Sequence, residues 1–237
     1  VKRFEARSCQ RADIVFAAPN DQTELEGLGV AKDKFRTTYH LGDDSALAAP
    51  QLQYTDTRNT LMYVGTLSWP ANSDGLLWFL REVWPGLKSA HADLHFDILG
   101  QGAGDDLKMA VDKLQDVQLH GFVEDLEPFY RKSRAFVAPL RFGSGTKVKV
   151  VTAMYRGIPC VTTSIGVEGI SLVEGVDVHV CDGATSMHER IELLLTDRLA
   201  WESMRDASRQ KALSDLSWDS MLENHARDLH VLAASRN

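Results

Sequence analysis

Short apolar runs alternate with amphipathic segments along most of this chain, and this alternation constrains the fold more than any other feature. Seven segments have the period of a helix: 22–28, 74–83, 105–114, 126–132, 147–155, 187–195 and 200–212. Eight runs have the length and composition of strands: 14–17, 35–39, 61–64, 94–99, 117–119, 135–139, 160–163 and 178–181. Continuous apolar runs are typical of parallel strands that are buried on both faces. The sequence therefore predicts an α/β fold with a doubly wound, Rossmann-like parallel sheet.

The pattern divides the chain into three parts. Residues 1–55 contain only two predicted strands, too few for a stable domain, and they end in a polar stretch without apolar period. Because Val1 lies in a helix-like segment, we expect these residues to be the end of a preceding domain and a linker. Residues 56–215 are predicted to form a complete Rossmann-like domain. Residues 216–237 are predicted to form a terminal helix, with Ser217 as its N-cap.

Composition argues against several classes of function. The net charge is −7 and no run of lysine or arginine occurs, so we expect no nucleic-acid partner. The three cysteines are far apart, none has metal-ligand spacing, and two lie in apolar runs. We therefore expect reduced thiols, no metal site and a cytoplasmic protein. No apolar stretch approaches the roughly 20 residues of a membrane-spanning helix.

Glycines follow several of the predicted strands. Gly65, Gly100 and Gly121 each come directly after an apolar run, and a glycine-rich loop at 143–145 follows the run that ends at Leu140. In open parallel sheets, ligands bind beyond the carboxyl ends of the strands, where glycine lets the backbone approach a ligand. A tight turn explains any single one of these glycines equally well. Four glycine positions at the same sheet edge favour a binding cleft.

The loop "FGSGTK" at 142–147 carries the strongest signal for a phosphorylated ligand. Its free N–H groups and the dipole of the following helix would attract phosphate. Lys147 and Lys149 add positive charge, but residues two apart on a helix do not share a face, so we expect only one to face the ligand. Lys147 is the better candidate, and for Lys149 ligand binding and solvent exposure are equally consistent with the pattern. The loop does not match a P-loop, and residues 100–104 are an incomplete dinucleotide fingerprint.

Residues 61 to about 213 resemble the donor-binding domain of glycosyltransferase family 4, the group 1 glycosyltransferases. The most specific segment is "LHGFVEDLEPFYRKSRAFVAPLRFGSGTKVKVVTAMYRGIPCVTTSIGVEGI", and "YVGTLSWPANSDGLLWFLREVWPGL" and "FDILGQG" resemble the first two strands with their helix. The resemblance implies the C-terminal half of a GT-B fold, in which two Rossmann-like domains face each other. Residues 1–50 resemble the end of the N-terminal domain, and 218–232 resemble the helix that crosses back onto it. Most of the acceptor-binding domain would then lie outside this chain.

The resemblance also implies an activity: a sugar moves from a nucleotide-diphosphate sugar to a glycan, lipid-linked or small-molecule acceptor with retention at the anomeric carbon. No metal or other cofactor is expected, and polysaccharide biosynthesis and peripheral membrane contact through the N-terminal domain are compatible with it. By similarity, Gly121, Phe122, Val123 and Thr152 would contact the nucleoside, and Lys147 would stabilise the departing diphosphate. Glu168 is equally consistent with sugar binding and with an exposed turn. The expected donor and phosphate site comprises Gly65, Gly143, Ser144, Gly145, Thr146, Lys147 and Lys149.

The sequence departs from the family pattern at two pairs of positions. Ser144 and Thr152 replace two glutamates that usually lie eight residues apart, and the second normally binds the ribose hydroxyls. Thr66 and Asp74 stand where a basic pair usually follows the first strand; we interpret 72–74 as the cap of a helix that begins at Gly75. An active transferase and a degenerate nucleotide-binding or scaffold module therefore remain as alternatives. A nucleotide-sugar epimerase is a remote third, against which the match over some fifty residues argues.

Overall fold

A six-stranded parallel sheet forms the centre of the main body. A computed structural model describes residues 2–39, 41–143 and 145–234 of the chain. The strand order is β5-β4-β3-β6-β7-β8, and every neighbouring pair is parallel. The strands are β3 (Arg58–Val64), β4 (His95–Leu99), β5 (Val117–Leu119), β6 (Ser133–Ala138), β7 (Cys160–Thr162) and β8 (His179–Val180). This arrangement confirms the predicted doubly wound parallel sheet.

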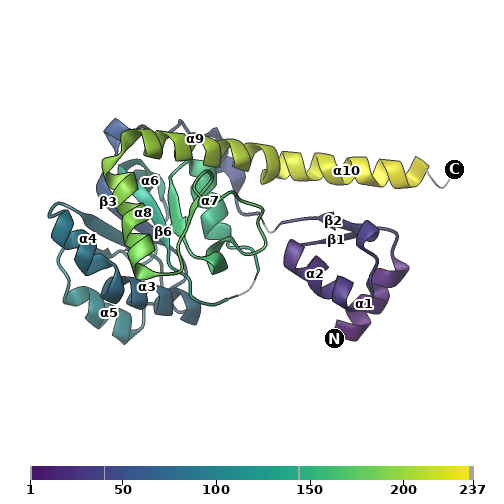
Figure 1. Cartoon of the computed structure of the whole chain (residues 1–237), viewed down its shortest axis with the longest axis horizontal. Coiled ribbons are helices and arrows are strands. Elements are labelled where there is room, and N and C mark those ends of the chain that lie inside the picture. The colour runs from purple at the N-terminus through teal and green to yellow at the C-terminus, as the bar shows by residue number, and fades with distance from the viewer. Residues whose placement is uncertain (1, 40, 144, 235–237) are drawn as a thin grey trace.

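Helices cover both faces of this sheet (Figure 1). They are α3 (Pro70–Glu82), α4 (Trp84–Ala90), α5 (Asp105–Asp112), α6 (Glu127–Lys132), α7 (Val148–Arg156), α8 (Ala184–Thr196) and α9 (Arg198–Asp215), with a short 3-10 helix η4 (Ser164–Val167). The core between the layers contains fully buried Leu61, Phe136 and Val137. The chain runs outward from β3 to β5, then returns to the other side of β3 at β6. The carboxyl ends of β3 and β6 therefore mark the topological switch point, where ligands bind in such sheets.

A small N-terminal unit stands beside the main body in Figure 1. It contains α1 (Lys2–Arg11), β1 (Val15–Ala17), α2 (Pro19–Gly27), η1 (Lys32–Lys34) and β2 (Phe35–Thr37). The two strands pair in parallel, and a separate small core of Ala6, Ala17, Val30 and Phe35 holds the unit together. Two strands and four buried side chains are far less than an independent domain needs.

The terminal helix α10 (Trp218–Ala234) connects the two parts, because it leaves the main body and runs along the N-terminal unit (Figure 1). The ring of His225 lies 4.2 Å from that of Phe16, and Arg36 forms an ion pair of 3.0 Å with Asp228. At the start of α10, the Ser217 hydroxyl accepts a hydrogen bond of 3.2 Å from the Ser220 amide. The predicted cap at Ser217 is confirmed.

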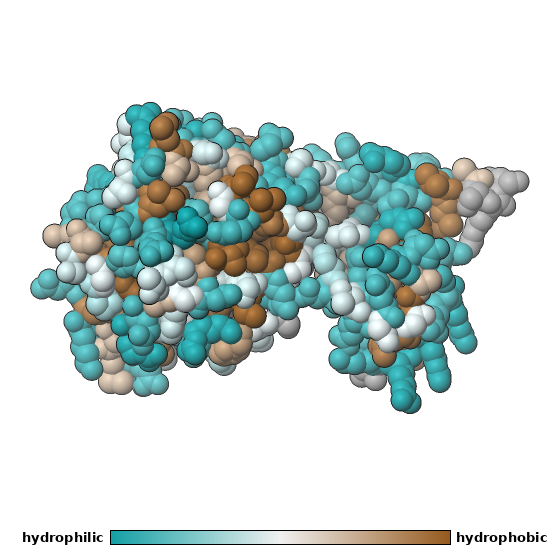
Figure 2. Space-filling model, in the orientation of Figure 1, coloured by the Kyte–Doolittle hydropathy of each residue, from teal (hydrophilic) through white to brown (hydrophobic). Residues whose placement is uncertain are grey.

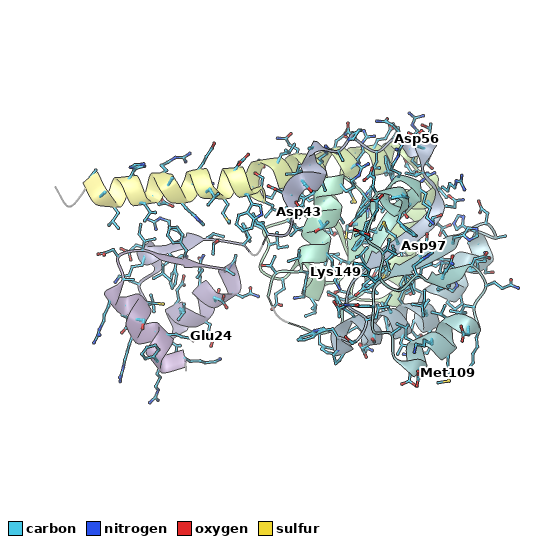
Figure 3. The ribbon with its side chains drawn as sticks, turned by 180° about the vertical axis from the view of Figure 1, so that it is seen from behind. Glu24, Asp43, Asp56, Asp97, Met109 and Lys149 are labelled. Carbon is cyan, nitrogen blue, oxygen red and sulfur yellow. The ribbon has the colours of Figure 1, made fainter. Side chains whose placement is uncertain are left out.

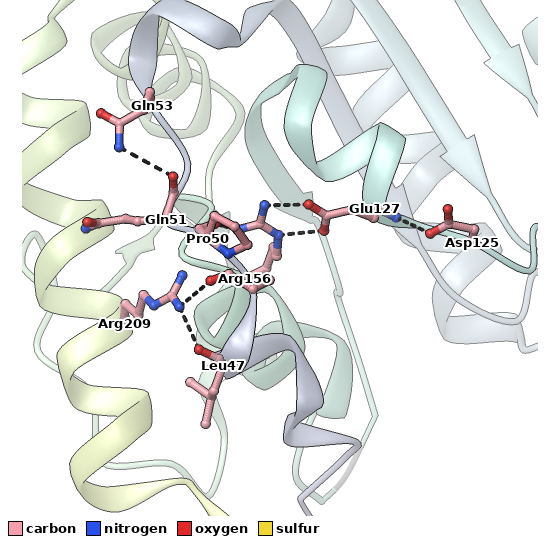
Figure 4. A network of polar contacts seen from close by, with 9 residues as sticks. Leu47, Pro50, Gln51, Gln53, Asp125, Glu127, Arg156 and Arg209 are labelled. Carbon is pink, nitrogen blue, oxygen red and sulfur yellow. Dashed lines mark hydrogen bonds and ion pairs between the residues drawn. The ribbon is translucent and has the colours of Figure 1, made fainter.

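The segment between the two parts contains η2 (Asp44–Ala48) and η3 (Tyr54–Asp56), and it is firmly held. Arg156 donates to the carbonyl of Pro50 (2.7 Å), and Arg209 donates to the carbonyls of Leu47 and Ala49 (2.6 Å each). Glu127 binds the same Arg156 guanidinium through two hydrogen bonds of 2.6 and 2.7 Å (Figure 4). The sequence predicted a linker over the polar stretch 51–59. Arg205 of α9, distant in sequence, donates to the Leu52 carbonyl (2.8 Å) in its first part, and its last two residues already belong to β3.

The predicted start of the first long helix is wrong. Helix α3 begins at Pro70, where proline suits the first helical turn, and not at Gly75. Asn72 does not cap the helix; its amide donates to the Thr66 carbonyl (2.7 Å), which fixes the preceding loop. Gly75 lies inside the helix. This position requires glycine, because an added Cβ would approach the Pro139 carbonyl oxygen to 2.2 Å. Helix α4 was not predicted, since Pro85 interrupts the sequence pattern at its first turn.

Candidate functional site

A cleft of about 1030 Å³ opens at the switch point, beyond the carboxyl ends of β3 and β6. Its walls come from the β3–α3 connection, α6, the loop after β6 and the first turns of α7. It therefore lies where the glycine pattern predicted a binding cleft. The predicted site residues that line it are Gly65, Gly143, Thr146, Lys147, Lys149 and Thr152.

Other predicted site residues lie elsewhere. Gly145, together with Thr146, borders a second hollow of about 800 Å³ between the main body and the N-terminal unit, visible in Figure 2. Gly121, Phe122 and Val123 are not among the described residues that line the 1030 Å³ cleft, although Leu126 of the same connection is. Phe122 is 74% exposed. The proposed contacts of these three residues with a nucleoside stay a prediction, and Ser144 lies outside the described residues.

Two of the strand-end glycines provide space for close contacts. An added Cβ at Gly100, where φ is +147°, would lie 1.8 Å from the carbonyl oxygen of Gly65, so this glycine serves the packing of neighbouring backbone. At Gly65 an added Cβ would lie 2.8 Å from both the Lys149 ammonium and the Tyr63 hydroxyl. Gly65 therefore makes room for a polar cluster inside the cleft.

Lys147 lies at the N-cap of α7, next to the glycine loop. Its ammonium donates to the Gly145 carbonyl (2.6 Å) and to a carboxylate oxygen of Glu168 (3.4 Å), and only 11% of its side chain is exposed. Glu168 is therefore more than an exposed turn acid, because it compensates the charge of a lysine that lines the cleft.

Lys149 also lines the cleft, on the side of the main body that faces the N-terminal unit (Figure 3). Its ammonium donates to the Tyr63 hydroxyl and to Oδ1 of Asn72, at 2.6 Å each. Burial, with a smaller effect from Lys147, lowers the pKa of Lys149 to about 7. The expectation that only one lysine faces the cleft is wrong. Lys147 precedes the helix (φ −90°, ψ 85°), so helical spacing does not separate the two side chains.

Thr152 lies one turn into α7 and lines the same cleft. Its hydroxyl donates to the Val148 carbonyl at 2.9 Å, a bond within its own helix. The backbone of Gly42 packs closely against this face, since a Cβ there would lie 2.7 Å from a methyl group of Val148. Asp74, in contrast, pairs with Arg141 at 3.4 Å and is not among the described lining residues.

The sequence reasoning missed two polar members of the site, Tyr63 and Asn72. Tyr63 lies inside an apolar strand and Asn72 inside a helical pattern, so only the glycine between them pointed to the cleft. Among the described residues, no cluster of three or more His, Cys, Asp or Glu side chains could hold a metal ion. No helix within the described part of the chain is long and apolar enough to cross a membrane.

Comparison with known proteins identifies the family. Residues 58–197 match the family model described as "Glycosyl transferases group 1". An uncharacterized 44.6 kDa protein in the cps region of Klebsiella pneumoniae is 31% identical over 123 residues, which are 48% of this chain and 31% of that protein.

Several solved structures share the fold. TarM of S. aureus is 16% identical with a TM-score of 0.75, over 95% of this chain and 45% of TarM. Anabaena HepE in complex with UDP is 14% identical with a TM-score of 0.77, over 97% of this chain and 67% of HepE. The chain thus spans less than half the length of the Klebsiella protein and of TarM. Its sheet corresponds to one half of a GT-B fold, and the chain belongs to the group 1 glycosyltransferases.

Proposed function

We propose that this chain is the donor-binding part of a retaining glycosyltransferase, which moves a sugar from a nucleotide-diphosphate sugar to an acceptor. One observation carries the proposal: the glycine loop, the start of α7 and two lysines meet in one cleft at the switch point. Backbone N–H groups at a helix start and nearby ammonium groups suit a diphosphate. Structures of similar proteins support a nucleotide-sugar donor, since HepE was solved with UDP-glucose and the pneumococcal O-GlcNAc transferase GtfA with UDP and GlcNAc.

The chemistry asked of these residues is charge stabilisation. Negative charge builds up on the diphosphate as its bond to the sugar breaks, and donors aimed at this charge lower the barrier. Lys147 and the amides at the start of α7 fit this role without a metal ion. The ammonium of Lys147 would exchange its bond to the Gly145 carbonyl for a phosphate oxygen, while Glu168 keeps it in place. Gly143, Gly145 and Thr146 would contact the phosphates or the sugar.

The acceptor would be a glycan, a lipid-linked sugar or a small molecule, bound by residues that this chain does not contain. We propose polysaccharide biosynthesis as the setting, because the Klebsiella relative lies in a cps region. We place the reaction in the cytoplasm, where nucleotide sugars are substrates and where the free thiols of Cys9, Cys160 and Cys181 stay reduced. Peripheral contact with a membrane would come through the N-terminal domain.

A second candidate function is a nucleotide-binding or scaffold module without catalysis. Thr152 favours it, because a threonine cannot replace the charged acceptor that usually binds the ribose.

Calorimetric titration with nucleoside diphosphates and their sugar esters tests the proposal. We expect binding of at least one of them, weakened about tenfold by Lys147→Met, which removes one charged hydrogen bond. Lys113→Met is the matched control, because Lys113 is exposed at the end of α5 and does not line the cleft. Absence of binding to the whole panel would contradict the proposal and leave the scaffold alternative.

A further inference from the structure

Lys149 is a partly buried lysine whose two hydrogen-bond partners are both neutral. The Tyr63 hydroxyl comes from β3 and the Asn72 carbonyl oxygen from α3. Two carboxylates of neighbouring segments are already engaged: Glu168 pairs with Lys147, and Asp74 of α3 pairs with Arg141. Tyr130 of α6, the other titratable group that lines the cleft, has a pKa raised above its usual range by burial. Within the described residues, Lys149 therefore forms no ion pair with a carboxylate.

The ammonium of Lys149 reaches from α7 to the end of β3. It lies so close to Gly65 that a single methyl group there would approach it to 2.8 Å. Asn72 is itself fixed, because its amide nitrogen donates to the Thr66 carbonyl at 2.7 Å. The family usually carries a basic pair after this strand, and in this chain those positions are Thr66, in the β3–α3 connection, and Asp74, inside α3. Lys149 thus supplies, from another element, a positive charge at the place that lacks one.

We infer that Lys149 is a second cation, beside Lys147, that neutralises the diphosphate of the ligand, and that above neutral pH the ligand binds together with a proton that Lys149 takes up. Tyr63 and Asn72 are positioning residues that aim its ammonium into the cleft. The inference rests on the proposed function and adds a regulation of the same site by pH.

The direction of the linkage follows from the environment of Lys149. Burial and Lys147 lower its pKa to about 7 in the free protein, so Lys149 is largely neutral at pH 8. Burial raises the pKa of Tyr63 far above its usual range, so the tyrosine keeps its proton throughout. A bound anion favours charged lysine and raises its pKa. Affinity should be constant below about pH 7 and fall by up to about tenfold per pH unit above it, until the pKa of the complex is reached.

Calorimetry with UDP-glucose between pH 6 and 9, in buffers of different ionisation enthalpy, measures this uptake. Both ends of its diphosphate are esterified, so the ligand lacks the phosphate ionisation near pH 6. We expect uptake approaching one proton at pH 8. Lys149→Arg, which stays charged, should abolish the pH dependence, and Lys149→Met should weaken binding about tenfold at pH 6.5. Lys113→Arg is the control and should leave the affinity and its pH dependence unchanged. Binding without proton uptake would overturn the inference and leave the proposed function intact.

A second measurement does not need a nucleotide. The 13Cε signal of Lys149, assigned as the one lost in Lys149→Met, is followed from pH 5 to 11 with and without pyrophosphate. We expect a midpoint near pH 7 for the free protein and a higher one with pyrophosphate. A midpoint at the ordinary value of lysine, or one that pyrophosphate does not move, overturns the inference. If the midpoint moves with pyrophosphate but no nucleotide binds, the proposed function fails and the anion site stands.

Discussion

At the residue scale, we propose that Thr152 limits how well the cleft can hold a ribose. Its side chain lines the cleft and forms a hydrogen bond only within its own helix, so a longer side chain has space on the cleft side. Thr152→Glu should tighten nucleotide binding about fivefold, or ~1 kcal/mol, because a charged acceptor binds hydroxyl groups more strongly than a neutral one. Calorimetry and a melting curve measure this, with Thr152→Gln as the control for length without charge. Unchanged affinity, or a large fall in melting temperature, would mean that residue 152 does not face the ribose.

Gly65 tests whether the position of the Lys149 ammonium matters. Gly65→Ala places a methyl group 2.8 Å from this ammonium and from the Tyr63 hydroxyl, so one of these side-chain ends must move. We expect about tenfold weaker diphosphate binding with a small change in melting temperature. Gly104→Ala is the matched control, because nothing lies within 4 Å of its added Cβ and its φ is −70°. Equal affinity of the two variants would show that the Lys149 cluster does not contribute to binding.

The residue scale also shows what sequence reasoning can and cannot find in such a site. The glycine loop predicted the cleft because a strand, a glycine turn and a basic helix start are all local features. The partners of Lys149 were not predictable, since Tyr63 and Asn72 lie 86 and 77 residues away in the chain. The expectation that only one of Lys147 and Lys149 faces the cleft was wrong for a local reason: the helix starts one residue later than its period indicated.

At the scale of elements, Arg156 ties α7 to α6 and to the connecting segment. Its side chain is only 3% exposed and binds Glu127 and the Pro50 carbonyl (Figure 4). Arg156→Met should lower the free energy of unfolding by about 2 kcal/mol, because it removes the charged hydrogen bonds of a nearly buried guanidinium to Glu127 and Pro50. Arg198→Met is the control: Arg198 forms an exposed pair with Glu202, and such pairs contribute roughly 0–1 kcal/mol. Urea denaturation compares the stability of the two variants, and equal midpoints would contradict the role assigned to Arg156.

The period of apolar residues predicted most helices and strands. Where the prediction failed, a physical cause can be named. The run at 117–119 coincides with β5, the edge strand of the sheet, where Val117 is buried and Gln118 is exposed. The start of α3 was missed because Asn72 and Ser73 resemble a cap, while their side chains instead bind carbonyls of the preceding loop. The polar stretch before β3 looked like a linker because its order comes from distant arginines, which leave no local pattern.

At the scale of the whole molecule, we expect the small N-terminal unit to limit activity. Strands β1 and β2 form a two-stranded sheet, too small for an acceptor site, and the chain covers 45% of TarM. We expect this chain alone to bind nucleotide sugar and to transfer little or none of it. Assays with radiolabelled nucleotide sugars and a panel of glycan and lipid-linked acceptors measure the transfer. Robust transfer to a defined acceptor would show that these 237 residues already form a complete active site.

The cleft lies beyond the carboxyl ends of β3 and β6, next to the first turns of α7. A crystal structure of this chain with a bound nucleoside diphosphate tests the central claim most directly. We predict that the diphosphate lies at the start of α7, with phosphate oxygens about 2.7–2.9 Å from the ammonium groups of Lys147 and Lys149. A nucleotide bound elsewhere, or a cleft that stays empty at saturating concentration, would contradict the account.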